Sequence, residues 1–150
     1  MTDGLVIRPL EPSFQDEALR LIEAGLAEHF GTLDPARNPD LRDIAGFYGA
    51  ENFYVAFVGD EMVGTAALGH ESDGCCRFAR MSVRPEHRRR GVGTAMLDHL
   101  LSVAAARGYY RIVLETTRDW HAAQAFYRAN GFRIVSVDEA RAEVNFERRL

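Results

Sequence analysis

Residues 81–97 read Met-Ser-Val-Arg-Pro-Glu-His-Arg-Arg-Arg-Gly-Val-Gly-Thr-Ala-Met-Leu, and this stretch decides how the chain folds. An alternating run ends at Pro85, a basic turn with two glycines follows, and the apolar residues after Gly93 recur at helical spacing. The stretch therefore predicts a strand, a turn and a helix in that order. The first N–H groups of such a helix have no partner within it and lie at the positive end of its dipole, so the turn is predicted to bind an anion.

The composition of the turn supports this prediction. Gly91 and Gly93 lack a Cβ, which permits unusual φ angles and lets a ligand oxygen approach the main chain. Arg88, Arg89 and Arg90 add positive charge at the same place. A diphosphate is the predicted ligand, and a merely solvated run of arginines is the alternative interpretation.

Hydrophobic periodicity predicts the other elements on both sides of this stretch. The predicted strands cover residues 5–10, 53–58, 62–68, 77–83, 112–114, 132–137 and 142–146, with a hairpin turn at 59–61. The predicted helices cover residues 14–30, 41–48, 92–107 and 119–130, the last with Asp119 as a candidate N-cap. In the strand before the turn, residues 79, 81 and 83 are predicted to form an apolar face opposite residues 78, 80 and 82.

The order βααβββαβαββ predicts an α/β fold of the α+β type. It consists of a central mixed, twisted sheet of about seven strands flanked by about four helices, with a ligand at the C-terminal ends of the strands.

The overall composition limits the class of protein. With 150 residues, 47% of them hydrophobic, the chain fits a single domain spanning residues 1–150. A net charge of -4 argues against general nucleic-acid binding. Cys75 and Cys76 are adjacent and suggest neither a metal site nor a disulfide framework, so no metal is expected. The first ten residues contain no long apolar run, so no signal peptide or membrane helix is expected and a cytoplasmic location is predicted.

Two motifs together carry a resemblance to a known family. Arg88-x-x-Gly91-x-Gly93 follows a strand, and Tyr127 lies downstream in the segment 125–132, Ala-Phe-Tyr-Arg-Ala-Asn-Gly-Phe. With the element order, these motifs resemble the GNAT superfamily of acetyl-CoA-dependent N-acetyltransferases over roughly residues 53–132. The resemblance implies that acetyl-CoA is the cosubstrate. It also implies that the cofactor is bound by Met81, Ser82, Val83, Arg88, Arg89, Arg90, Gly91, Val92, Gly93 and Thr94, through the main chain of the strand and the amides of the turn.

Tyr127 is the candidate general acid, because a phenol near the departing sulfur could protonate it. The alternative is an aromatic side chain that only packs against the sheet. The reaction also needs a base, because only the free amine is a nucleophile. Glu115, which ends the strand before the tyrosine helix, is the candidate. The alternative is that Glu115 is a solvated carboxylate at a strand end. Five weaker candidates for the base are each expected to be surface residues: His70, Glu71, Asp73, Glu28 and His29.

Two positions depart from the family pattern. Trp120 stands where many relatives have an asparagine that contacts the cofactor, so that contact is either absent or replaced, and Trp120 is itself a candidate cofactor-binding residue. Arg77 stands where others have a basic glutamate. Arg77 or Arg80 is then available to meet an acidic group of the acceptor, or both are charges on an exposed strand face.

The resemblance implies transfer of an acetyl group to a primary amine by direct attack in a ternary complex. A coenzyme A-binding sensor or scaffold without catalysis is the alternative, and a dinucleotide-binding fold is disfavoured because Met96 occupies the third glycine position. The expected acceptor is a small-molecule amine or amino acid, or a peptide N-terminus, bounded by the first two helices and residues 70–74. Neither nucleic acid nor membrane is an expected partner, and a homodimer stays open.

Overall fold

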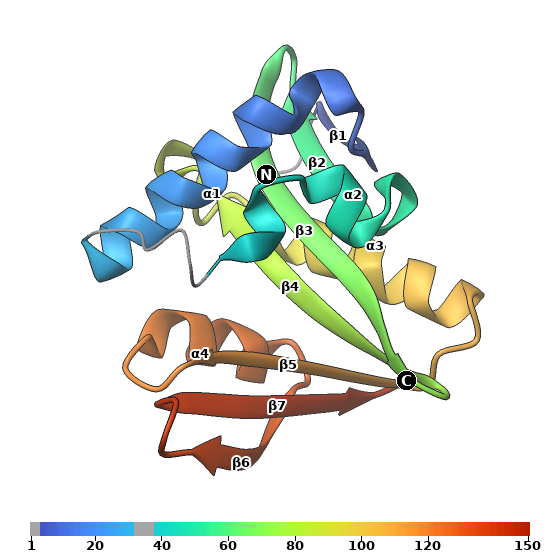
Figure 1. The fold of residues 1–150 in the computed structure, drawn as a ribbon, viewed down its shortest axis with the longest axis vertical. Coiled ribbons are helices and arrows are strands. Elements are labelled where there is room, and N and C mark those ends of the chain that lie inside the picture. The colour runs from blue at the N-terminus through green and yellow to red at the C-terminus, as the bar shows by residue number, and fades with distance from the viewer. Residues whose placement is uncertain (1–3, 32–37) are drawn as a thin grey trace.

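A computed structural model describes residues 4–31 and 38–150, which form one sheet of seven strands in the order β1-β2-β3-β4-β5-β7-β6 (Figure 1). The strands are β1 Leu5–Pro9, β2 Phe53–Val58, β3 Glu61–Ser72, β4 Cys75–Val83, β5 Arg111–Thr117, β6 Arg133–Asp138 and β7 Glu143–Arg149. The α-helices are α1 Gln15–Phe30, α2 Ile44–Tyr48, α3 Val92–Ala106 and α4 His121–Ala129. The predicted order and the mixed sheet are confirmed.

The helices cover the sheet on both faces and bury two apolar clusters. α1 and α2 pack on one face over a cluster that includes Phe53, Val55 and Met62, which are fully buried. α3 and α4 pack on the other face over a cluster that includes Leu97 and Phe146. Residues 53–57 of β2 and 62–68 of β3 are buried, because helices cover both faces of these strands.

The sheet divides between β4 and β5, the two neighbouring strands that run parallel. Their pairing covers Cys75–Arg77 against Arg111–Val113, after which the register has no further partners in the described chain. Figure 1 shows the two strands diverging from this junction towards the end where α3 begins. Six residues of β4 follow the junction. On the side that faces β5, their backbone groups are not paired with a strand in the described chain.

β4 also contains an irregularity that the alternation pattern did not predict. Arg80 has a φ of 53°, and the pairing with β3 shifts between Thr65 and Ala67. The hydroxyl of Thr65 donates to the Arg80 carbonyl at 2.8 Å and holds this bulge. As a result, Ala79 packs with the α1 cluster whereas Met81 packs with the α3 cluster, so the prediction that they share a face is wrong.

The predicted N-cap of α4 is also wrong. The helix begins at His121 with Trp120 at the N-cap position and no side-chain capping bond, and Asp119 lies outside it. Within the described ranges, no helix is long and apolar enough to span a membrane.

Candidate active site

The turn before α3 has the geometry of an anion-binding site. Gly91 is the N-cap residue with a φ of 83°, and Arg89 has a φ of 63°, so the chain passes twice through the left-handed region. The bond from the Ala95 N–H to the Gly91 carbonyl, at 2.9 Å, opens the helix. The amides of Val92, Gly93 and Thr94 therefore precede the first helical bond and point out of the helix end.

Gly93 lets α4 approach this turn closely. A Cβ at this position would lie 3.4 Å from the ring of Phe126, a residue of α4. The mouth of α3 is therefore bordered by the aromatic face of the helix that carries Tyr127. This places the predicted anion site and the predicted catalytic helix beside each other.

Arg88 lies at the same turn but is engaged by α1. Its Nη1 donates to the Glu28 carboxylate at 2.5 Å, and its Nε donates to the Val83 carbonyl at 3.3 Å. The hydrogen bond from Arg88 lowers the pKa of Glu28. Glu28 was expected to be a surface residue, and although it is half-exposed it lines a small pocket with Arg88 and the end of β4. Sequence analysis had no signal for this contact, since the two residues are sixty positions apart.

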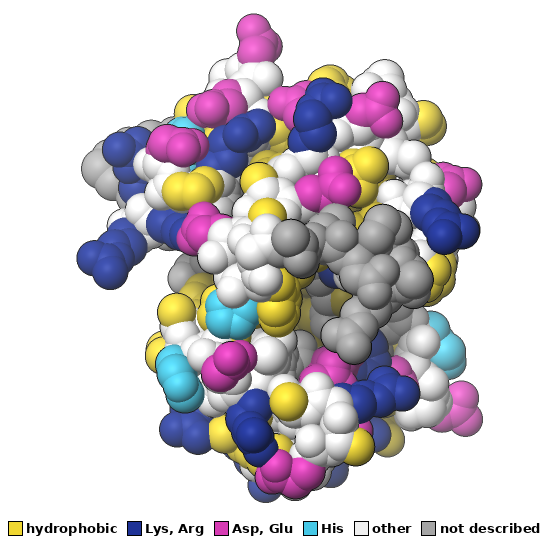
Figure 2. All heavy atoms as spheres, turned by 60° about the vertical axis from the view of Figure 1, so that its left-hand side comes forward, with side chains coloured by type: hydrophobic (Ala, Val, Ile, Leu, Met, Phe, Trp, Pro, Cys, Tyr) yellow, Lys and Arg dark blue, Asp and Glu magenta, His cyan; other side chains and the backbone are white. Residues whose placement is uncertain are grey.

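The positive charge of this turn comes from exposed arginines, since both Arg88 and Arg89 are exposed. Figure 2 shows arginine and acidic side chains interspersed over the face that it draws. The chain contains no lysine, so all of its permanent side-chain cations are arginines.

Tyr127 projects from α4 into the second apolar cluster. Its ring lies 5.7 Å from that of Phe132 and 6.0 Å from that of Phe146. Burial raises the pKa of Tyr127 to about 12. Within residues 4–31 and 38–150, its hydroxyl makes no hydrogen bond to another residue.

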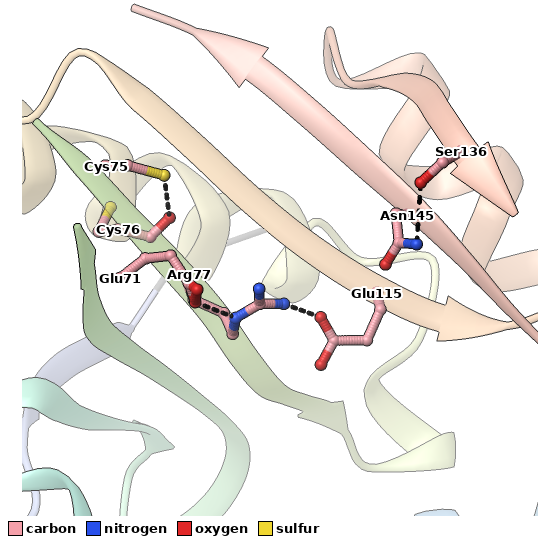
Figure 3. Close-up of polar contacts among 7 residues, drawn as sticks. All are labelled: Glu71, Cys75, Cys76, Arg77, Glu115, Ser136 and Asn145. Atoms are coloured by element: carbon pink, nitrogen blue, oxygen red, sulfur yellow. Dashed lines mark hydrogen bonds and ion pairs between the residues drawn. The ribbon is translucent and has the colours of Figure 1, made fainter. Parts of the chain in front are cut away.

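Glu115 lies at the point where β4 and β5 separate, two residues after the last paired residue of β5. Its carboxylate is paired with Nη1 of Arg77, and Nε of Arg77 donates to Glu71 at 2.7 Å. Figure 3 shows the Arg77 side chain extending from β4 across to Glu115 on β5. Each of the three side chains is about 36% exposed or slightly less, so this chain of charges is open to solvent.

Arg80 has a different environment from Arg77. Two of its nitrogens bond the carboxylate of Asp40 at 2.7 and 2.8 Å, and the Tyr48 hydroxyl donates to the same carboxylate at 2.6 Å. Burial would raise the pKa of Asp40, but the bonds from Arg80 and Tyr48 outweigh it and hold the pKa below its ordinary value. Arg80 is therefore not a charge on an exposed strand face, and Asp40 is a residue that sequence analysis missed.

Trp120 joins the two sides of the divided sheet. Its indole stacks on His29 of α1 with ring centroids 4.2 Å apart, and Asp119 lies 3.5 Å from the same imidazole. The end of α1 thus contacts the loop between β5 and α4. The predicted contact of Trp120 with the cofactor stays a prediction.

Together these features define a class of protein. A divided pair of parallel strands that leads to a glycine turn at the start of a helix is a site for an extended ligand that carries a phosphate or diphosphate group. The residues fit coenzyme A: the amides and arginines suit its phosphates, and the unpaired edge of β4 suits an extended amide-bearing arm. No cluster of three metal-ligating residues occurs among the residues described.

Comparison with known proteins identifies the family. The model of the acetyltransferase (GNAT) family matches residues 18–132, and the chain belongs to this family. N-acetylaspartate synthetase of Xenopus tropicalis is 35% identical over 111 residues, which make up 71% of this chain. The match spans 41% of that relative's length.

Two solved structures share the fold. A GNAT-family acetyltransferase of Staphylococcus aureus superposes with a TM-score of 0.87 and 23% identity, over 97% of this chain and 99% of its own. N-acetylglutamate synthase of Neisseria gonorrhoeae, in complex with coenzyme A and N-acetyl-glutamate, superposes with a TM-score of 0.78 and 20% identity, over 97% of this chain and 35% of its own. The predicted family and GNAT fold are confirmed.

Proposed function

We propose that this protein transfers the acetyl group of acetyl-CoA to the primary amine of a small acceptor in a ternary complex. The family assignment supports an acetyl-CoA-dependent N-acetyltransferase. The main support for the proposal comes from the end of β4. There the edge of the strand that does not pair with β5 leads directly to the open amides at the start of α3. An extended ligand arm that ends in phosphates requires a site of this form.

The proposed cofactor site consists of the main chain of residues 81–83, the side chains of Arg88, Arg89 and Arg90, and the amides of residues 91–94. Trp120 is proposed to border it. When bound, acetyl-CoA supplies an activated acetyl group as a thioester. The chain's part is to hold the phosphates at the positive helix end and to keep water out of the gap between β4 and β5.

Tyr127 is the proposed general acid. Because its pKa is raised to about 12, the phenol keeps its proton throughout the physiological pH range. A partly buried phenol without a competing acceptor among the described residues can deliver that proton to a leaving group that reaches it.

Glu115 is the proposed base. It lies at the opening between the strands, where an amine must arrive, but its carboxylate is paired with Arg77. Glu115 can accept a proton from the ammonium group of the acceptor once that group has replaced Arg77 as its partner.

An amino acid is the proposed acceptor class. The names of N-acetylaspartate synthetase and N-acetylglutamate synthase support it, because both describe acylation of an amino acid. A peptide N-terminus is the second candidate.

Coenzyme A release from acetyl-CoA, measured with amino acids, polyamines, aminoglycosides and short peptides, tests the proposal. Because the chain has no lysine, none of its own side-chain amines competes as acceptor. We expect Tyr127→Phe to lower kcat by at least about a hundredfold without changing the Kd for coenzyme A. Tyr110→Phe is the matched control, since Tyr110 is 55% exposed and its backbone bonds Gly74, which precedes β4, whereas the turn follows the far end of β4.

The two functional alternatives give different results. Tight binding of coenzyme A without turnover of any acceptor would support the sensor function. An unchanged rate in Tyr127→Phe would remove Tyr127 from the reaction.

A further inference from the structure

The acidic and basic side chains where β4 and β5 separate form a series of alternating charges. Arg77 lies between Glu71, which it bonds through Nε at 2.7 Å, and Glu115, which it contacts through Nη1 (Figure 3). Among the described residues Arg77 makes contacts through only these two nitrogens, so Nη2 is available to a further acceptor. A guanidinium can bind a carboxylate with two parallel N–H groups.

The location of this series relates it to the acceptor. Arg77 and Val113 form the last paired position of β4 and β5, so Glu115 lies just beyond the junction on the diverging strand. The distance between the strands grows from this point, which gives the two side chains room to separate. Arg77 also belongs to the sheet face that carries α1 and α2, opposite the face that carries α3.

The Arg77–Glu115 contact is suited to exchange. Both side chains are 36% exposed, and ion pairs that reach water contribute little to stability. Arg80 behaves in the opposite way, because its guanidinium is bound by two nitrogens to a buried carboxylate. Of the two arginines that could meet an acidic acceptor, only Arg77 can change partner at low cost.

We propose that the Arg77–Glu115 pair is the receptor for the zwitterionic head group of an α-amino acid. The acceptor's carboxylate takes the place of Glu115 on Arg77, and its ammonium group pairs with the released Glu115. The charges then alternate from Glu71 through Arg77, the carboxylate and the ammonium to Glu115. This inference rests on the proposed function and names the recognition residues of its acceptor site.

The neighbouring side chains support this assignment. Asn145 on β7 pairs in register with Glu115, and its amide donates to Ser136 at 3.0 Å. Both neighbours are uncharged, so neither of them competes with Arg77 for the acceptor's carboxylate (Figure 3). Glu71 keeps hold of Nε while Nη1 changes partner, so Glu71 acts as a positioning residue for the guanidinium.

The test compares amino acids with the amines that lack their α-carboxylate. The probe pairs are L-aspartate with β-alanine, L-glutamate with γ-aminobutyrate, and L-phenylalanine with phenethylamine. In the wild type we expect kcat/KM for the better amino acids to exceed that of the paired amine at least tenfold. We expect Arg77→Gln to raise KM for the amino acid and to reduce this preference to less than threefold, with Arg77→Lys in between.

Four measurements separate recognition from a structural role. Arg118→Gln is the matched control, because Arg118 forms an exposed pair with Glu139 outside the junction. Glu71→Gln should weaken the preference partly, and in all variants the Kd for coenzyme A should stay within twofold of wild type. Calorimetric titration of the same amino acids into the coenzyme A complex repeats the comparison without turnover.

The outcomes are distinct. If Arg77→Gln lowers kcat/KM for both members of each pair by the same factor, or if the wild type prefers the amine without the α-carboxylate, the inference is wrong and the acetyltransferase proposal stands. If the wild type acetylates nothing, the proposed function is wrong. The calorimetric comparison then decides the inference alone, and equal binding of amino acid and amine would overturn it.

Discussion

The buried contact between Asp40 and Arg80 allows a quantitative prediction. In Asp40→Asn the side chain keeps its shape but loses its charge, so the Arg80 guanidinium loses its anionic partner in a site where it is only 18% exposed. Removing one partner of a buried ion pair costs about 3–5 kcal/mol, and some access of water to Arg80 favours the lower value. We therefore expect the free energy of unfolding to fall by about 3 kcal/mol, which lowers the Tm of a 150-residue chain by about 6–12 °C.

Urea unfolding of both proteins at pH 7 measures this difference. Glu139→Gln is the control, since Glu139 and Arg118 are 74% and 54% exposed, and its cost should be below about 1 kcal/mol. Combining Asp40→Asn with Arg80→Gln should recover part of the loss, because the double variant no longer buries an unpaired charge. A loss below about 1 kcal/mol in Asp40→Asn would refute the reasoning.

The pH dependence follows from the lowered pKa of Asp40. A carboxyl group whose pKa is lower in the folded state stabilises the fold fully above its unfolded pKa, which is about 3.9. That stabilisation is lost as the pH falls through the folded pKa. The difference between wild type and Asp40→Asn should therefore be constant above about pH 5 and shrink below about pH 4. The same variant should weaken coenzyme A binding, since Arg80 occupies the bulge that directs the end of β4.

Two further changes test the turn before α3. Gly91→Ala places a side chain at a φ of 83°, so we expect a loss of about 1 kcal/mol in urea unfolding and weaker coenzyme A binding. Gly69→Ala is its control, because a Cβ added there meets no atom within 4 Å and Gly69 has no positive φ; an equal loss in both variants would contradict the role of the positive φ. Glu28→Gln releases Arg88 towards the phosphates, so the Kd for coenzyme A should fall about two- to fivefold in calorimetry at low salt. A higher Kd would mean that Glu28 supports Arg88 instead of competing for it.

Local sequence patterns predicted most of the architecture. The hairpin at Gly59-Asp60, the order of elements and the glycine turn were predictable because each depends on residues close together in the chain. β3 extends to Ser72, beyond the predicted end at Leu68, because its polar last residues still pair with β4. Periodicity cannot predict an extension that pairing with a neighbouring strand stabilises.

The candidate site was predictable only in part, for a related reason. The bulge at Arg80 depends on Asp40 and Thr65, which are far away in the sequence, so strict alternation was the natural expectation for β4. The partners of Glu115 and Trp120 come from other elements as well, since they are Arg77 on β4 and His29 on α1. Residue type indicated which side chains carry chemistry, but only the fold shows which of them meet.

The short junction between β4 and β5 has a mechanical consequence. Three aligned residue pairs join a four-stranded ribbon to a three-stranded one, so in the described chain the two blocks share few backbone bonds. Breathing motions of the molecule should concentrate along this line, and amide hydrogens of Ile112 and Val113 should exchange faster than those in the middle of β2. A ligand bound between β4 and β5 would contact both blocks and restrain their relative motion. Amide hydrogen exchange should then slow on binding even in strands that the ligand does not contact.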